Sequence, residues 1–176
     1  YSHDELVYKM GNREDREILR GQYELLREID DIHFVKVYDW FEEEDRCGYS
    51  MEKLDGKPPG EIFNESPENK DEFSRVRKIL RNILDGLKVI HDRGIIHGDI
   101  KPSHIFITER DNIKIIDPGY DPDILTPLYA APEALMGEPV KASDIYSTGI
   151  LLYEIIAGKP PFTGELTEII RAKLSG

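Results

Sequence analysis

The first 54 residues carry their hydrophobic positions mainly in short β-prone runs. One stretch differs, because from Glu14 onward the apolar residues recur at helical spacing, which predicts an amphipathic helix. The runs 34–41 and 49–54 are joined by an acidic turn, so we expect them to form an antiparallel hairpin. This part of the chain is predicted to be a small, β-rich unit that contains one helix.

Beyond this unit the pattern becomes mainly helical. Residues 55–59 hold a glycine and two prolines, and we place a boundary there that divides the chain into lobes 1–54 and 55–176. Ser66-Pro67 has the form of an N-cap followed by proline in the first helical position, which predicts the start of a long helix. The later elements are expected as strands at 105–108 and 113–116, a buried helix capped by Ser143 and ending near Gly158, and a last helix from about Glu165.

Composition excludes several classes of protein. The formal net charge of −12 argues against general binding to nucleic acid or to an anionic membrane, since both reward Lys and Arg. No apolar run approaches the roughly 20 residues that a membrane span needs. The single cysteine, Cys47, precludes an intrachain disulfide and lies beside Gly48 in a predicted β-turn. We therefore expect a cytoplasmic protein in which this thiol has no chemical role.

The candidate chemistry lies between residues 95 and 117. Asp99 and Lys101 lie two residues apart on a loop between apolar runs, an arrangement that suits phosphoryl transfer. The Asp can orient and deprotonate an attacking hydroxyl, while the Lys can neutralise charge on the phosphoryl group. Asp117 ends the predicted strand 113–116, where a carboxylate can hold a Mg²⁺ ion that bridges phosphates. Alone, an Asp–Lys pair is more often a surface ion pair, so the assignment depends on further motifs.

Five segments, taken in order, resemble the motifs of the eukaryotic-type Ser/Thr protein kinase family. The pattern H-R-D-L-K-P-x-N is similar to residues 97–104, and D-F-G is similar to residues 117–119. T-P-x-Y-x-A-P-E is matched in full by residues 126–133. The D-x-x-S-x-G helix start resembles residues 144–149, and the turn that follows it resembles residues 158–162. The resemblance implies an α+β, bilobal fold with a truncated β-rich N-lobe and a larger, mainly helical C-lobe.

The resemblance also implies an activity, transfer of the γ-phosphate of ATP to a protein hydroxyl, with ATP and Mg²⁺ as cofactors. Matched residue by residue, it assigns catalytic roles to Asp99, Lys101 and Thr126 and a metal-binding role to Asp117. The segment Val7–Met10 resembles V-A-I-K, whose Lys, here Lys9, contacts the phosphates. The adenine site would comprise Val7 above the ring, Phe106 below it, Met51 as gatekeeper, and the backbones of Glu52 and Leu54.

The sequence departs from the family pattern at four positions. Gln22 stands where the Lys-pairing Glu is expected, and it can hydrogen-bond Lys9 without carrying charge. His104 replaces the Asn that ligates a second metal, and an imidazole suits a hard cation less well than an amide oxygen. Pro118 replaces the Phe of D-F-G, and Gly98 replaces an Arg that reads a phosphorylated activation loop. The Gly-rich phosphate loop and the last C-lobe helices have no counterpart in these 176 residues.

Three functions remain open at this level. The first is a Ser/Thr kinase with weakened activity, motivated by the retained Asp99, Lys101 and Asp117. The second is a pseudokinase that binds nucleotide or a protein partner, motivated by Gln22 and His104. The third is a small-molecule phosphotransferase, which the complete Ala-Pro-Glu segment at 131–133 disfavours. In the first two cases the partner is a protein.

Overall fold

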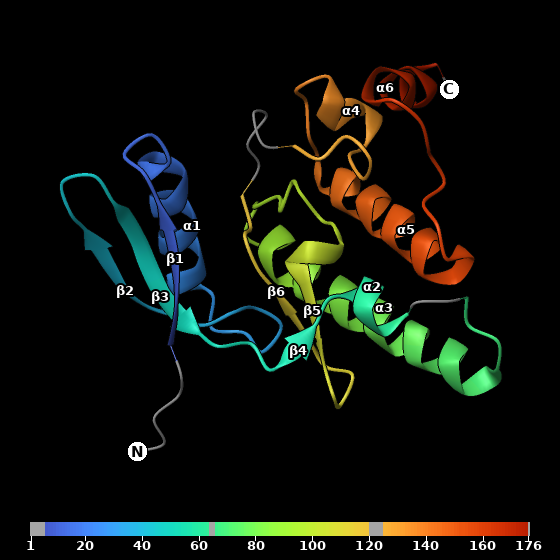
Figure 1. Ribbon diagram of the computed structural model, residues 1–176, viewed down its shortest axis with the longest axis horizontal. Helices are drawn as coiled ribbons and strands as arrows, with labels where there is room; N and C mark the ends of the chain where they lie inside the picture. Colours follow the sequence, from blue (N-terminus) through green and yellow to red (C-terminus); the bar gives the residue numbers. More distant parts are fainter. Residues whose placement is uncertain (1–5, 64–65, 120–124, 176) are drawn as a thin grey trace.

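The structure, a computed structural model, describes residues 6–63, 66–119 and 125–175. Its first part is an antiparallel sheet with strand order β1-β3-β2, covered on one face by helix α1 (Figure 1). The elements are β1 (Leu6–Gly11), α1 (Arg16–Glu28), β2 (Val37–Glu42) and β3 (Cys47–Glu52). The predicted hairpin is thus confirmed, with its strands shifted by two or three residues.

Helix α1 presents one face to the sheet. Its buried residues, Leu19, Tyr23 and Leu26, are spaced by three or four positions and so lie on one side of the helix. In β3, Gly48 permits a close approach to β1, because a Cβ atom there would lie 2.0 Å from the carbonyl oxygen of Lys9. This packing sets the height of Lys9 relative to α1.

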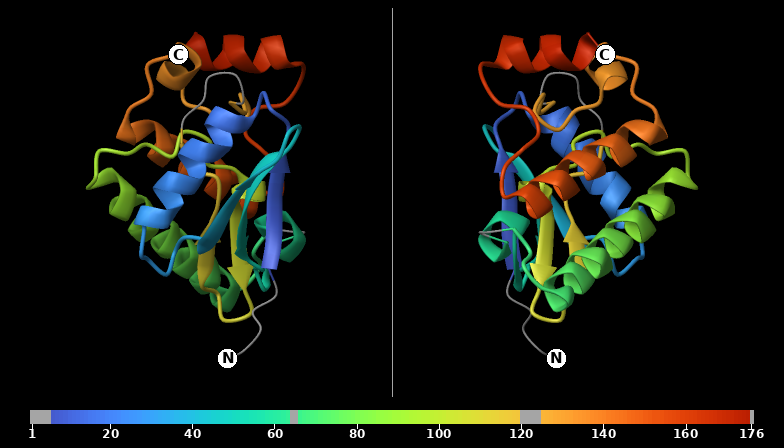
Figure 2. Two further views of the ribbon diagram at one scale, coloured as in Figure 1. Left: turned by 90° about the vertical axis from the view of Figure 1, so that its left-hand side faces the viewer. Right: turned by 90° about the vertical axis from the view of Figure 1, so that its right-hand side faces the viewer.

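The second part is mainly helical, with a small sheet on the side that faces the first part (Figures 1 and 2). Its strands are β4 (Gly56–Lys57), β5 (Ile105–Thr108) and β6 (Ile113–Ile115), and the strand order is β4-β5-β6. Its helices are α2 (Pro59–Ile62), α3 (Lys70–His91), the 3₁₀ turn η1 (Pro102–His104), α4 (Pro132–Leu135), α5 (Lys141–Ala157) and α6 (Leu166–Leu174). Within the described residues, no helix is both long and apolar enough to cross a membrane.

The two parts share one apolar core. Phe34 forms a parallel bridge with Ile115 of β6, and the backbone N–H of Val35 donates to the carbonyl of Ile115 at 3.1 Å. Buried side chains from α1, α3, α5 and both sheets form a continuous cluster. The two parts are therefore packed against each other through a common core. The predicted boundary at residues 54 and 55 falls between β3 and β4 and stays a prediction.

Two local predictions were wrong. Helix α3 begins at Lys70, not after Ser66-Pro67, because the side chain of Asn69 accepts the backbone N–H groups of Asp71 and Glu72 and so caps the helix. Residues 55–59, the predicted breaker, hold the two-residue strand β4 and lead into the short helix α2, which has Pro59 in its first position.

Cys47 is the site of the second wrong prediction. It is the buried first residue of β3 and is not in a turn, and its thiol donates to the carbonyl of Asn12. Ser143 also differs in detail from expectation, because α5 begins two residues before it and its Oγ accepts from the N–H of Val140 inside the first turn.

Candidate active site

The loop 97–101, which carries Asp99 and Lys101 and is called the catalytic loop below, is held in place by a buried carboxylate. Asp144, in the first turn of α5, is 1% exposed, and its two oxygens accept the backbone N–H groups of His97 at 2.9 Å and Gly98 at 2.8 Å. The Nε2–H of His91, at the end of α3, donates to the same carboxylate at 2.7 Å. Three donors therefore satisfy one buried charge, which fixes the start of the loop relative to two helices.

His97 is a structural member of this loop. Its Nε2–H donates to the carbonyl of Ile116 at 3.0 Å, and its Nδ1 accepts the N–H of Asp99 at 3.3 Å. The carbonyl can only accept, so these two bonds specify a single neutral tautomer. Burial lowers the pKa of His97 below its ordinary value, since the ring is fully enclosed. Both nitrogens are occupied, and neither is free for acid–base chemistry.

Asp99, Lys101 and Thr126 converge at the end of the loop. Lys101 Nζ lies 2.5 Å from Asp99 Oδ2 and donates to Thr126 Oγ1 at 2.8 Å. The N–H of Thr126 donates to Asp99 Oδ1 at 3.2 Å. Asp99 Oδ2 is buried, and its contact with Lys101 is an ion pair that lacks hydrogen-bond geometry. The three predicted catalytic residues are thus brought together, with one carboxylate oxygen retaining a lone pair for another donor.

Asp117 faces Lys9 across the space between the two parts. Lys9 Nζ lies 2.6 Å from Asp117 Oδ1 and donates to Gln22 Oε1 at 2.9 Å. The predicted hydrogen bond between Gln22 and Lys9 is therefore present. Asp117 has a φ of 57°, a left-handed conformation that costs a non-glycine residue free energy. That strained backbone turns its carboxylate towards Lys9.

His104 bridges the two acids. Its Nδ1–H donates to the backbone carbonyl of Asp99 at 2.8 Å, so in the neutral ring the lone pair is on Nε2. Nε2 lies 3.7 Å from Asp117 Oδ2. Burial lowers the pKa of His104 to about 4, although the neighbouring carboxylates oppose that shift. The ring is therefore uncharged near pH 7.

Asp117 and His104 lie close enough together to contact one divalent cation. An ion with bonds of about 2.1 Å to each ligand spans up to about 4.2 Å, and Asp117 Oδ2 lies 3.7 Å from His104 Nε2. Among the described residues there is no group of three or more His, Cys, Asp or Glu side chains placed to bind a metal. Phosphate oxygens and water are suitable further ligands for such an ion.

A cavity of about 320 Å³ joins these groups. Its lining includes Lys9, Gln22, Asp99, Lys101, His104 and Asp117, together with residues of β1 and of the first turns of α1. The sequence missed the contribution of Asp15, Ile18 and Leu19 to this lining, because nothing in a helical pattern shows which turn faces a distant loop.

The residues predicted to surround adenine lie apart from that cavity. Val7 and Met51 are cross-strand neighbours in β1 and β3, and Val7 is 37% exposed. Among the described residues, no backbone hydrogen bond involves the N–H or C=O of Leu54. The carboxylate of Glu52 is engaged by Lys114 of β6 at 2.6 Å and by the N–H of Lys36 at 2.9 Å. The sandwich of Val7 and Phe106 around a ring stays a prediction.

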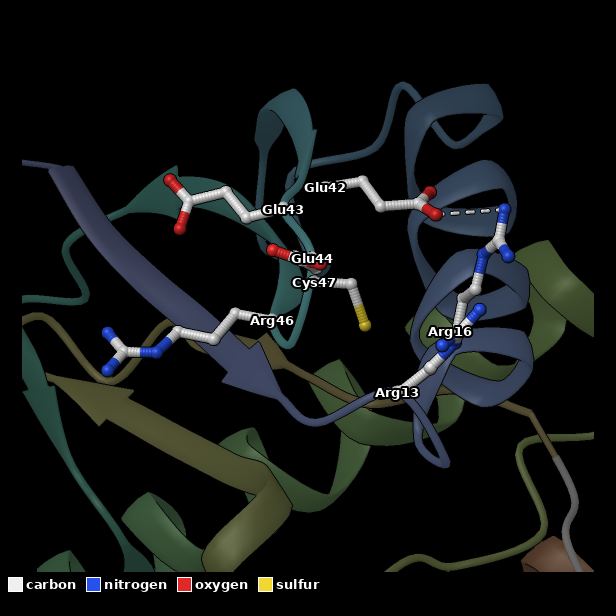
Figure 3. Close-up of a pocket in the computed structure, with 7 residues that line it drawn as sticks. All are labelled: Arg13, Arg16, Glu42, Glu43, Glu44, Arg46 and Cys47. Atoms are coloured by element: carbon white, nitrogen blue, oxygen red, sulfur yellow. Dashed lines mark ion pairs between the residues drawn. The ribbon is translucent and has the colours of Figure 1, made fainter.

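A second cavity, of about 310 Å³, lies away from these acids at the turn between β2 and β3 (Figure 3). It is lined by three arginines and three glutamates, with Arg16 and Glu42 forming an ion pair at 2.9 Å. Cys47 also lines it, but the side chain is buried and its thiol is hydrogen-bonded. The balanced charges give this cavity no selectivity for either sign of ligand.

Comparison with known proteins agrees with this geometry. The family model for the protein kinase domain matches residues 6–175, so the chain belongs to the protein kinase family. The predicted fold, a small antiparallel N-lobe sheet with a helical C-lobe, is confirmed with it.

The curated relatives are kinases by name. The chain is 31% identical over 173 residues to calcium-dependent protein kinase 5 of Plasmodium falciparum (isolate 3D7), a match that covers 90% of this chain and 30% of that protein. It is 30% identical over 174 residues to human myosin light chain kinase 3, covering 90% of this chain and 21% of that protein. The chain thus spans less than a third of the length of these relatives.

Proposed function

We propose that this domain transfers the γ-phosphate of ATP to a Ser or Thr hydroxyl of a protein, with Asp99 as the base that orients and deprotonates that hydroxyl. The observation that carries the proposal is the convergence of Asp99, Lys101 and Thr126, because Asp99 is the acceptor and Lys101 the cation that such a transfer needs. A cytoplasmic location and a protein substrate belong to the same proposal.

Asp99, Lys101 and Thr126 would have different roles in this reaction. Asp99 Oδ2 retains accepting capacity, so it can receive the proton of the hydroxyl. Lys101 lies beside it and offsets negative charge that develops on the transferred group. Thr126 donates its N–H to Asp99 and accepts from Lys101, which holds the two side chains in register.

Lys9, Asp117 and His104 form the nucleotide side. When bound, Mg²⁺ and ATP would supply the reactive phosphate, and Asp117 and His104 would hold the metal. Lys9 would exchange part of its contact with Asp117 for phosphate oxygens. The adenine ring would lie against Val7, Met51 and Phe106, close to the backbone of Leu54, which makes no backbone–backbone hydrogen bond to another described residue.

The test is phosphate transfer from ATP to a Ser-containing and a Thr-containing peptide library by the full protein, compared with its Asp99→Asn variant. We expect transfer by the parent protein and a loss of about a hundredfold or more in kcat for the variant, because general-base catalysis contributes on that order. Nucleotide affinity, followed by thermal shift with ATP and Mg²⁺, should be unchanged. Equal kcat for the two proteins would contradict the role of Asp99.

The pseudokinase alternative is the other outcome of the same experiment. It requires that no phosphate is transferred under any metal condition tried. A thermal shift with nucleotide would then indicate a pseudokinase that binds nucleotide, and no shift would indicate one that does not. The comparisons do not favour it, since the relatives are kinases by name. Robust transfer that Asp99→Asn abolishes would exclude it.

A further inference from the structure

Lys173, near the end of α6, is a buried amine that the site described above does not use. Lys173 is 5% exposed, and helix α6 packs against α4 (Figure 1). In the sequence Lys173 looks like the polar face of an amphipathic helix, so its burial comes from the tertiary structure. A buried ammonium is costly unless its protons are satisfied.

Each part of the Lys173 ammonium has a partner. Nζ donates to the carbonyl oxygens of Leu128 and Ala130, both at 2.8 Å. It also lies 4.9 Å from the ring centre of Phe162 and 5.2 Å from that of Tyr146. Two charge-assisted hydrogen bonds and two aromatic faces are a complete environment for a buried cation.

The segment that Lys173 holds is the loop 126–131, and the opposite end of this loop touches the catalytic base. Thr126 donates its N–H to Asp99, and its own carbonyl accepts the N–H groups of Tyr129 and Ala130, both at 3.0 Å. The loop is thus a tight turn with one end at Asp99 and the other on Lys173. The loop therefore lies directly beside the carboxylate that we propose accepts the proton of a substrate hydroxyl.

We propose that Lys173 is a positioning residue that holds the loop 126–131 as the platform on which residues next to the phosphoacceptor of a protein substrate dock. The inference rests on the proposed transfer reaction, because it assigns the loop a substrate. Lys173 acts through Leu128 and Ala130 and touches neither Asp99 nor Lys101.

The hydrogen-bond acceptors of Lys173 Nζ are backbone carbonyls of the loop. Glu133, at the start of α4, accepts the hydroxyl of Ser143 at 2.5 Å. The anchor is consequently directed at the backbone of the loop and is independent of the side chains that the loop carries.

Lys173→Met keeps most of the volume of the side chain and removes both hydrogen bonds. We expect the KM for a peptide substrate to rise about tenfold, in line with the loss of hydrogen bonds to a charged group, while kcat and the KM for ATP stay within about twofold. The matched control is Lys159→Met, an exposed lysine in the turn after α5, which should change none of these constants. A peptide KM within twofold of the parent value, or equal changes in the KM for peptide and for ATP, would overturn the proposal.

The pH profile gives a second readout that a merely structural role would not move. Burial lowers the pKa of Lys173 to about 8, so the parent protein should lose the charge, and the peptide KM should rise, between about pH 7.5 and 9. The two phenols nearest this site stay protonated and uncharged over that range, since burial raises the pKa of Tyr129 and of Tyr146. Lys173→Met should show no such rise, and a rise of the same size in that variant would contradict the assignment.

Hydrogen exchange separates this proposal from the proposed function. If the parent protein transfers no phosphate, the proposed function fails, while the amides of Tyr129 and Ala130 still report on the anchor. We expect them to exchange about tenfold faster in Lys173→Met, with the amides of α3 unchanged. Unchanged exchange at Tyr129 and Ala130 would overturn the anchoring role whatever the activity.

Discussion

The catalytic loop and strand β1 face the same cavity, yet they are held in place in different ways. In the loop, His97 and Asp99 are at most 7% exposed, and they are hydrogen-bonded to Asp144 of α5, to Ile116 and to Thr126. Strand β1 lies at the edge of its sheet and, within the described residues, pairs only with β3. Its Tyr8 and Met10 are 58% and 56% exposed.

This difference separates two requirements of phosphate transfer. The groups that we propose act on the hydroxyl are held by a buried network, so they need no rearrangement when substrate binds. The groups that we propose face the nucleotide are Lys9, Gln22, His104 and Asp117, and they contact one another at the edge of a cavity. The departures from the family pattern at Gln22 and His104 both fall on this second side.

The largest expected effect tests the buried side. Asp144→Ala would leave the N–H groups of His97 and Gly98 buried without a partner, so we expect the free energy of unfolding to fall by about 3 kcal/mol or more. Chemical denaturation followed by circular dichroism measures this. The control is Asp85→Ala, an exposed carboxylate on α3, which should stay within about 0.5 kcal/mol. Equal stabilities for the two variants would show that the loop does not depend on Asp144.

A smaller effect concerns the metal. The Nε2 lone pair of His104 favours a metal that accepts nitrogen ligands. In the presence of ADP, we therefore expect the ratio of Mn²⁺ affinity to Mg²⁺ affinity to be about tenfold higher in the parent protein than in His104→Asn. Isothermal titration of each metal into the ADP mixture measures the ratio. Electron spin echo of the Mn²⁺ complex should show imidazole nitrogen in the parent protein and none in the variant. Absence of that nitrogen signal from the parent protein would remove His104 from the metal site.

The smallest effect concerns the partner of Lys9. In Gln22→Glu, a carboxylate would share the ammonium with Asp117 and leave Asp117 freer for a metal, so we expect nucleotide affinity with Mg²⁺ to rise by a few-fold at most. Gln22→Met is the matched control, since it keeps the size of the side chain but removes the acceptor, and it should not raise the affinity. Thermal shift across an ATP titration compares the three proteins. Tighter binding by the Met variant than by the Glu variant would contradict the pairing described here.

The sequence by itself determined the family and the order of the elements. These follow from local patterns, because the spacing of apolar residues favours helix or strand and motif residues such as Asp99 and Lys101 are close in the chain. The resemblance also showed that Gln22 can hydrogen-bond Lys9, and the structure contains that bond. The assigned roles of the site residues, including the adenine contacts of Val7 and Phe106, stay predictions.

The tertiary structure alone decided the rest. Helix α3 begins at Lys70 because the side chain of Asn69, and not that of Ser66, accepts the free N–H groups of the first turn. The roles of His91 and Lys173 could not be predicted, since their partners lie 53 and at least 43 residues away in the chain. The spacing of polar residues shows which face of a helix is polar. It does not show which carbonyl or carboxylate from a distant part of the chain will contact that face in the folded protein.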